Sequence, residues 1–116
     1  MTLVQQKVQA LTFVDEPLFN FNGKRMAELA LKHKLPMIAR TDHAEAGGLM
    51  GYGVDISDLW FRAASMVDKI LKGARPHDMP VERATKFEFT VNLKTAKAFG
   101  LQIPQPILLR AEKVIE

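Results

Sequence analysis

Three titratable side chains stand almost side by side in the sequence, at Asp42, His43 and Glu45. Carboxylates and an imidazole in an Asp-His-x-Glu arrangement can bind a metal ion or exchange protons with a substrate. The same residues are expected where a helix begins, because carboxylates stabilise the positive end of the helix dipole. We favour a capping or solvated-loop role for the three residues, and an enzyme site is the alternative.

A second candidate is the glycine-rich segment 47–53, which holds four glycines in seven residues. Glycine permits positive φ and close backbone approach, so we expect a hinge or a ligand-facing loop here. The segment lacks the Gly-Lys-Ser/Thr ending of a phosphate-binding loop and the spacing of a dinucleotide-binding loop. Tyr52 stands among these glycines with little local packing, which makes it a candidate ligand contact.

Two short strands and one helix are expected to position these residues. The run 11–14 is β-prone and ends before Pro17, which cannot continue a central strand. Asn22 is a good N-cap for a helix that Pro36 stops. The apolar run 37–39 is typical of a strand buried in a parallel sheet.

Strand, helix and strand in this order predict a βαβ unit with a right-handed crossover, and hence an α/β fold. Ligands of open α/β sheets bind beyond the carboxyl ends of the strands. The polar segments 15–17 and 41–43 follow the two strands. We therefore expect both segments to face one crevice.

A long helix follows the glycine-rich segment, capped by Asp55 and ended by Gly73. Its apolar residues recur at helical spacing over an unusually wide face that includes Trp60. For Trp60 we expect core or interface packing rather than ligand stacking. A face this wide indicates burial against more protein than a chain of this length supplies.

The last part of the chain predicts a strand and two helices. Residues 85–93 alternate between apolar and polar, which indicates a strand with one wet face. Asn92 is expected to cap a short helix that ends at Gly100, and Pro106 to begin a last helix whose apolar face includes Val114 and Ile115.

Composition favours a soluble globular chain. The 116 residues carry a net charge of +3, with Lys and Arg spread among Asp and Glu, so no nucleic-acid partner is expected. Cysteine is absent, which excludes disulfides, thiolate metal sites and a cysteine nucleophile. The first seven residues lack the basic flank and apolar centre of a signal peptide, so the chain as written would stay in the cytoplasm.

Several motifs occur together, in a fixed order, from Leu11 to the last residue. They are the glycine-rich segment with the helix ending at 67–76, then 79–82, 85–89, 91–97 and 103–116. In this combination the chain resembles the type I periplasmic substrate-binding proteins of ABC transporters.

The resemblance implies two α/β lobes that close on a small ligand and deliver it to a membrane permease. The chain would then be a single partial domain, 1–116, with a three-layer parallel sheet. Residues 11–50 and 80–116 would belong to the second lobe, and 51–75 would form the hinge and a helix packing on an absent first lobe. The complete protein is expected to be periplasmic or otherwise extracytoplasmic, and this chain a truncated form of it.

The resemblance also implies a ligand site in the loops that follow the strands. Its residues are Glu16, Phe19, Thr41, Asp42 and Tyr52. For an amino-acid-like ligand, carboxylates would meet an ammonium group and aromatic rings would cover an apolar side chain. Relatives often carry Ser at the position of Gly51, so one hydrogen bond to the ligand is expected to be lost.

Our prediction is therefore a binding protein without catalysis, cofactor or metal, acting by lobe closure. A ligand-sensor domain of the same architecture and a small flavodoxin-like α/β enzyme using Asp42, His43 and Glu45 are the alternatives. We also expect self-association, because an exposed apolar helix face and an unpaired sheet edge both favour a second copy.

Overall fold

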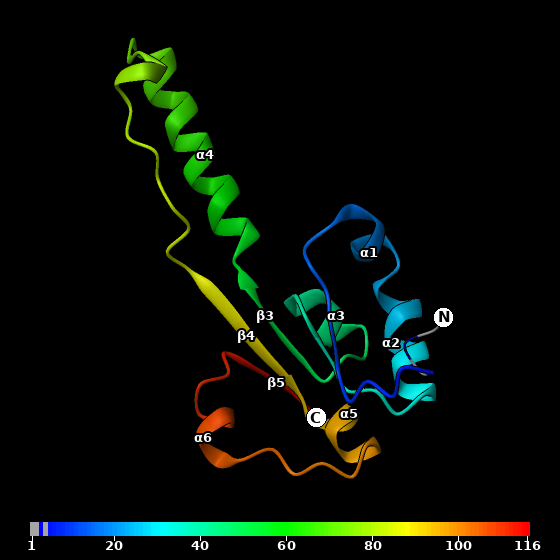
Figure 1. Ribbon diagram of the computed structural model, residues 1–116. Coiled ribbons are helices and arrows are strands. Elements are labelled where there is room, and N and C mark those ends of the chain that lie inside the picture. Colours follow the sequence, from blue (N-terminus) through cyan, green and yellow to red (C-terminus); the bar gives the residue numbers. More distant parts are fainter. Residues whose placement is uncertain (1–2, 4) are drawn as a thin grey trace. The chain divides into compact units, whose positions relative to one another are not determined.

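The computed structural model describes Leu3 and residues 5–116, and the chain has an α/β fold (Figure 1). The strands are β1 (Leu11–Thr12), β2 (Met37–Ala39), β3 (Met50–Val54), β4 (Phe87–Asn92) and β5 (Lys113–Ile115). The helices are α1 (Pro17–Phe21), α2 (Gly23–Lys32), α3 (Thr41–Glu45), α4 (Ile56–Leu71), α5 (Leu93–Ala98) and α6 (Gln105–Leu108), with a 3-10 turn at Pro76–Asp78. Two compact units result, one of Met1–Gly53 with Glu88–Glu116 and the other of Val54–Phe87.

The five strands form one sheet in the order β1-β2-β3-β4-β5. β1, β2 and β3 run parallel, and so do β4 and β5. Between the two groups, Asn92 N–H donates to the Leu49 carbonyl and Asp55 N–H to the Lys86 carbonyl, so β4 runs antiparallel to β3. The predicted α/β class with a mainly parallel sheet is confirmed, and the antiparallel pair was not foreseen.

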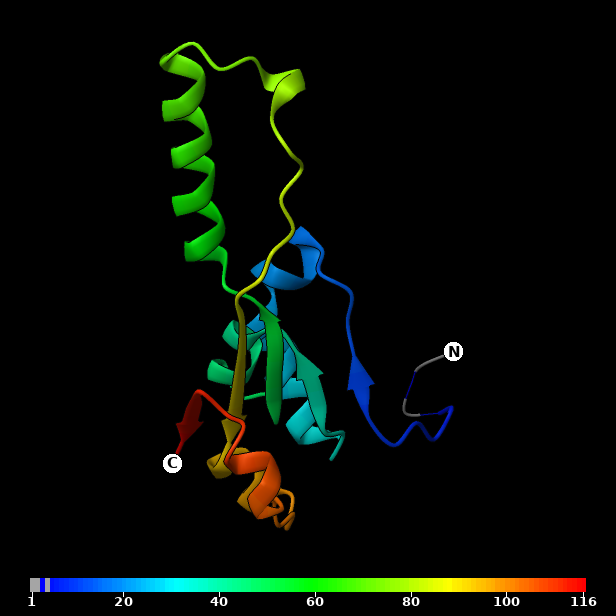
Figure 2. The same ribbon diagram turned by 90° about the vertical axis from the view of Figure 1, so that its left-hand side faces the viewer.

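The core of the first unit lies between β2 and α2. Met37 is 1% exposed and packs with Ala27 and Ala30, while Phe13 and Met26 lie around this cluster. Small alanine side chains let the helix approach the sheet closely. Figure 2 shows α2 and α3 together behind the strands, where α3 follows β2 and leads into β3.

The segment between β1 and α2 differs from its prediction. β1 is only two residues long, and Pro17, which was expected only to end the strand, begins the helix α1, where a missing N–H costs nothing. Asn22 does occupy the N-cap of α2, but its side chain donates to the Leu18 carbonyl and makes no capping bond.

The glycine-rich segment was predicted to be a hinge or a ligand-facing loop, and a loop is wrong for its second half, because Met50–Val54 is the strand β3. The hinge stays a prediction. Gly51 explains the difference. A Cβ at Gly51 would lie 2.5 Å from both the Arg40 carbonyl oxygen and Thr41 Cα. Glycine is therefore needed here so that β3 can lie against the end of β2.

The prediction of one wet face for the strand around residue 90 is also wrong. Val91 is fully buried, and Thr90 and Asn92 on the opposite face are 2% and 4% exposed. Both polar groups of the Asn92 side-chain amide make hydrogen bonds. Its Nδ2 donates to the Ala44 carbonyl at 2.9 Å, and its Oδ1 accepts from Thr95 N–H at 3.0 Å. Its predicted cap of α5 is confirmed.

The last helix was predicted to reach Ile115, but α6 ends at Leu108. Val114 and Ile115 lie instead in β5, which pairs with β4. Apolar residues at these positions fit a helix face or a strand, and pairing with β4 decides between the two.

The second unit consists of α4 and the segment that returns from it. Asp55 caps α4 by accepting from Asp58 N–H, and Gly73 follows the helix with φ +104°, both as predicted. Arg62 holds the returning segment through the Glu82 carboxylate, the Arg83 carbonyl and the Thr85 hydroxyl.

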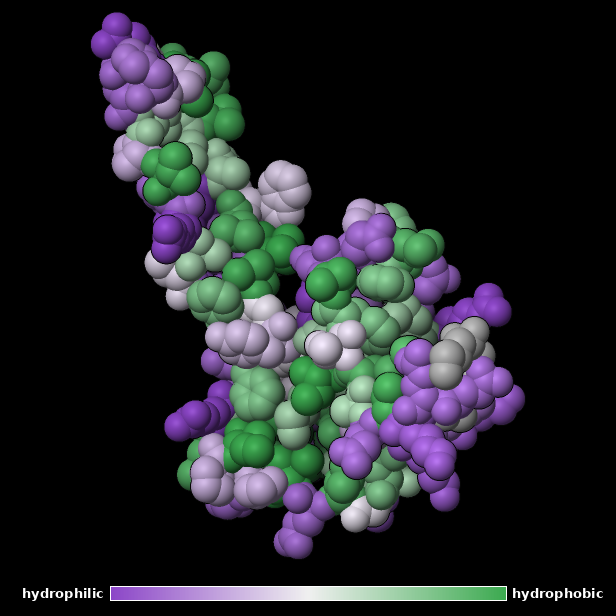
Figure 3. Space-filling view, in the orientation of Figure 1, coloured by the Kyte–Doolittle hydropathy of each residue, from purple (hydrophilic) through white to green (hydrophobic). Residues whose placement is uncertain are grey.

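Large apolar side chains of α4 are exposed, and Figure 3 shows hydrophobic surface along this helix. Trp60 and Phe61 are 73% and 79% exposed, so Trp60 is not a core residue of this chain. Assignment of α4 to another lobe and self-association both stay predictions, and light scattering over a range of concentrations tests the latter. None of the helices in the described part of the chain combines the length and apolar character that a membrane crossing needs.

Candidate functional site

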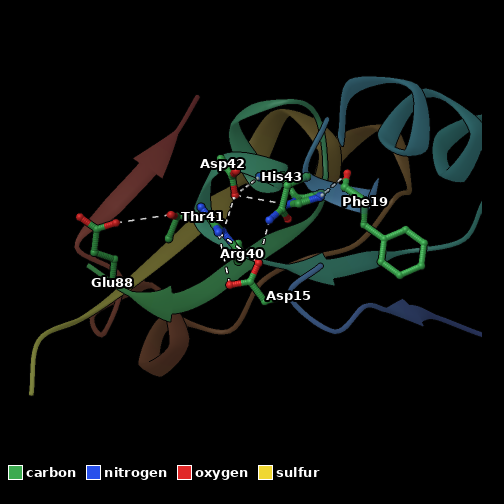
Figure 4. A network of polar contacts seen from close by, with 8 residues as sticks. Asp15, Phe19, Arg40, Thr41, Asp42, His43 and Glu88 are labelled. Atoms are coloured by element: carbon green, nitrogen blue, oxygen red, sulfur yellow. Dashed lines mark hydrogen bonds and ion pairs between the residues drawn. The ribbon is translucent and has the colours of Figure 1, made fainter. Parts of the chain in front are cut away.

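A network of charged side chains lies where β1 and β2 end (Figure 4). Asp15 follows β1 and Arg40 follows β2, and Arg40 Nη1 lies 3.1 Å from Asp15 Oδ1. The Nε of the same guanidinium lies 3.3 Å from Asp42 Oδ1. Arg40 is thereby held between two carboxylates at the carboxyl end of the parallel strands, where ligands of such sheets bind.

Hydrogen bonds from Asn20 and Arg40 lower the pKa of Asp15 below its ordinary value. The Asn20 amide donates to Asp15 Oδ1 at 2.7 Å. Partial burial alone would lower the pKa of Arg40, but the bond from Arg40 to Asp15 and the charge of Asp42 outweigh it, so this pKa is raised. Asp15 and Arg40 are therefore both charged at neutral pH.

His43 is buried next to this network, and only 2% of its surface is exposed. Its Nε2 lies 3.3 Å from the Phe19 carbonyl oxygen and its Nδ1 lies 3.2 Å from Asp42 Oδ1. The ring also faces Phe13, with centroids 6.4 Å apart. A buried imidazole with these partners is a packed, hydrogen-bonded histidine rather than an open proton-transfer group.

The three residues that suggested an enzyme are not brought together. Asp42 and His43 contact each other, whereas Glu45 lies 2.7 Å from Lys113 of β5. Asp42 lies in the first turn of α3, and Arg40 rather than Asp42 occupies the N-cap. Across the described residues, no three His, Asp or Glu side chains are placed to hold a metal ion.

Four of the five residues predicted to contact a ligand lie in the two segments that form the network. Glu16 is exposed at the N-cap of α1, and Asp42 is exposed in α3. Thr41 Oγ1 donates to Glu88 Oε2 at 3.4 Å. Phe19 turns its half-buried ring away from Arg40 in Figure 4 and packs it on Phe13, with centroids 5.5 Å apart.

Tyr52 lies apart from the other four. It is 59% exposed on β3, and its ring contacts Phe89 of β4 edge-on at 6.3 Å. Successive strand residues point to opposite faces, so Tyr52 faces away from the side on which Gly51 touches the Arg40–Thr41 backbone. A side chain at Gly51 would need space that the Arg40–Thr41 backbone occupies, and the expected loss of a hydrogen bond to the ligand stays a prediction.

We expected segment 15–17 to face the crevice, but the five residues predicted to contact the ligand did not include Asp15 or Arg40. Their positions directly after two strands were the available signal, since both carry a charge at a carboxyl end. No feature of the sequence marked Glu88 as part of the site, because Glu88 comes close to Thr41 only when β4 pairs with β3.

Solved structures show the same fold. A conserved domain protein from Vibrio cholerae has a TM-score of 0.88 at 23% identity, and covers 96% of this chain and 38% of its own. A ligand-free, open substrate-binding protein with adhesive properties from Clostridium difficile has a TM-score of 0.67 at 24% identity, with 97% and 39% covered. An ABC domain from Streptococcus pneumoniae in complex with L-Trp has a TM-score of 0.88 at 28% identity, also with 97% and 39% covered.

The chain thus spans less than two fifths of the length of these proteins. No curated protein matches it. The family of ABC transporter substrate binding proteins matches residues 1–115, which is nearly the whole chain. The chain belongs to the ABC transporter substrate-binding protein family.

Proposed function

We propose that this chain forms part of the ligand site of an ABC transporter's solute-binding component, and that the ligand is amino-acid-like. The family match supports the solute-binding role. The ligand class is supported by the similar pneumococcal protein, which was solved with L-Trp. The observation that carries the proposal is the network of Asp15, Arg40 and Asp42 at the carboxyl ends of two parallel strands.

The charge of this network favours a cationic ligand group. Asp15, Glu16 and Asp42 supply three carboxylates and Arg40 one guanidinium, which leaves two net negative charges. Arg40 is already bound by two of the carboxylates, so it acts as an internal counter-ion rather than as a receptor for a ligand carboxylate. An ammonium group fits such a site.

Asp42 is the best placed acceptor for that ammonium. Within the described structure its side-chain contacts, from Arg40 Nε, His43 N and His43 Nδ1, all fall on Oδ1. Its side chain is nearly half exposed, which leaves Oδ2 for a donor from the ligand. Glu16 and Thr41 would add polar contacts. Phe19 and Tyr52, whose rings face away from the network here, would cover the apolar part of the ligand only after a change in their positions.

Transport would follow by closure of this part of the protein and a second lobe around the solute. Contacts made only in the closed state would stabilise it, and a membrane permease would then receive the ligand. In this proposal the protein acts outside the cytoplasm.

Calorimetric titration of the chain with L-tryptophan tests the proposal. We expect saturable binding that weakens at least fivefold in Asp42→Asn and in the variants Glu16→Ala and Tyr52→Ala. Glu28→Ala, which removes an exposed carboxylate from α2, is the matched control and should bind as the wild type does. Unchanged affinity in all three site variants would refute the assignment of the site.

A further inference from the structure

We propose that His43 is the positioning residue of the ligand site, holding both α1 and Asp42 in their ligand-competent places. The inference rests on the proposed function, because it concerns the same site. His43 does not touch the ligand in this account. It acts through two groups, the Phe19 carbonyl, which its ring contacts, and the Asp42 carboxylate, which its backbone N–H contacts.

The two polar contacts of the imidazole both end on the site. A carbonyl oxygen only accepts, so Nε2 donates its hydrogen to the Phe19 carbonyl, 24 residues away in sequence. On the other side of the ring, Nδ1 lies 3.2 Å from Asp42 Oδ1, which also only accepts, so in this tautomer the His43 backbone N–H is the group that donates to Asp42 Oδ1. One buried side chain therefore links the segment after β1 to the helix after β2.

α1 depends on such links because it has few other means of support. It is five residues long, contains no buried residue, and its N-cap Glu16 makes no side-chain capping bond. A helix this short is not stable by itself. Within the described structure three side-chain hydrogen bonds hold it, Asn20 to Asp15, Asn22 to the Leu18 carbonyl and His43 to the Phe19 carbonyl, and the Phe19 ring packs on Phe13. The His43 bond is the one among these hydrogen bonds that comes from a distant part of the sequence.

The surroundings of the ring are shaped to hold it. Gly23 begins α2, and a Cβ at this position would lie 3.2 Å from His43 Cδ2 and 3.4 Å from Nε2. The Phe13 ring lies beside the imidazole, with centroids 6.4 Å apart. An imidazole fixed in this slot cannot turn without losing its hydrogen bond to the Phe19 carbonyl, so its orientation fixes the position of α1.

Two substitutions separate positioning from simple packing. His43→Leu keeps an apolar body and removes both ring nitrogens, whereas His43→Gln keeps an amide N–H that can reach the Phe19 carbonyl. His33→Gln is the matched control, because His33 is the exposed C-cap residue of α2. The measurements are hydrogen exchange of each amide, urea unfolding, and calorimetric titration with L-tryptophan.

For His43→Leu we expect about tenfold faster exchange at residues 17–22 and about tenfold weaker binding of L-tryptophan, with little change at the amides of β2 and α2. His43→Gln should restore at least half of both effects on a logarithmic scale. His33→Gln should change neither.

Faster exchange spread evenly over the first unit would show that His43 is an ordinary core residue and would overturn the proposal. Unchanged exchange at residues 17–22 would overturn it as well. If the wild type binds no L-tryptophan, the proposed function fails for that ligand class, and the exchange pattern alone then decides whether His43 positions α1. If His43→Leu does not fold, His43→Gln decides in its place. Faster exchange confined to residues 17–22 would then support the proposal, and faster exchange spread evenly over the first unit would overturn it.

Discussion

Arg40 Nη1 lies 3.1 Å from Asp15 Oδ1, and this ion pair joins the residues that follow two neighbouring parallel strands, 25 positions apart in the chain. The contact lies at the edge of the sheet where β1 and β2 both end. Because the guanidinium also reaches Asp42, one side chain organises both candidate segments.

Removing that guanidinium should affect the site more than the stability of the fold. Arg40→Gln is expected to cost about 1 kcal/mol or less in unfolding free energy, because the pair is partly exposed to solvent. The pKa of Asp15 should rise toward its ordinary value, which an NMR titration of its carboxyl carbon can follow. Arg25→Gln, an exposed arginine of α2, is the control and should leave the Asp15 titration as it is.

The lowered pKa of Asp15 has a consequence for acid stability. A carboxyl with a folded pKa below its unfolded value of 3.8 stabilises the fold fully above that pH, and the contribution is lost as pH falls through the folded pKa. Urea unfolding of the wild type and Asp15→Asn should therefore differ most near pH 7 and converge below pH 3.8. A stability difference that grows on acidification would contradict the assigned charge state.

Close backbone approach at Gly51 should make an added side chain destabilising in this chain. Gly51→Ala is expected to lower the unfolding free energy by about 1–3 kcal/mol, because the new Cβ would overlap the Arg40–Thr41 backbone. Gly53→Ala is the matched control, since a Cβ there would meet only Arg40 Cγ at an ordinary 3.6 Å. Equal effects of the two changes would argue against close packing at Gly51.

Arg62 should hold the segment that returns from α4. Arg62→Gln is expected to remove the contact with the Glu82 carboxylate and weaken those with Arg83 and Thr85, so amide exchange at residues 82–86 should accelerate. Lys72→Gln breaks only an exposed pair with Asp68 on the same helix and should leave that exchange unchanged. Protection that survives Arg62→Gln would mean that other contacts hold the segment.

Local signals predicted the elements that depend on local structure. Helical spacing identified α2 and α4, and the caps Asp55 and Asn92 occur where the sequence predicts them. Local sequence patterns predicted the wrong element where a contact with a distant part of the sequence determines the secondary structure. Val114 and Ile115 form a strand because β4 lies beside them, and β3 runs through glycines because Gly51 meets the end of β2.

The candidate site was predictable in position but not in composition. The rule that ligands bind beyond parallel strands led to Asp42 and to the segment after β1. The pairing of Arg40 with Asp15 joins residues far apart in sequence, and so does the pairing of Glu45 with Lys113, 68 positions away. Such contacts require the sheet order, which spacing in the sequence does not contain.

The most direct test of this account is an NMR titration of the ¹⁵N-labelled chain with L-tryptophan, which detects weak binding residue by residue. Saturable shifts should be largest at residues 15–22 and 40–43, with a smaller set at Tyr52. Shifts that are absent, or confined to the groove between α5 and α6 around Lys97 and Leu101, would contradict a ligand site at the ends of β1 and β2.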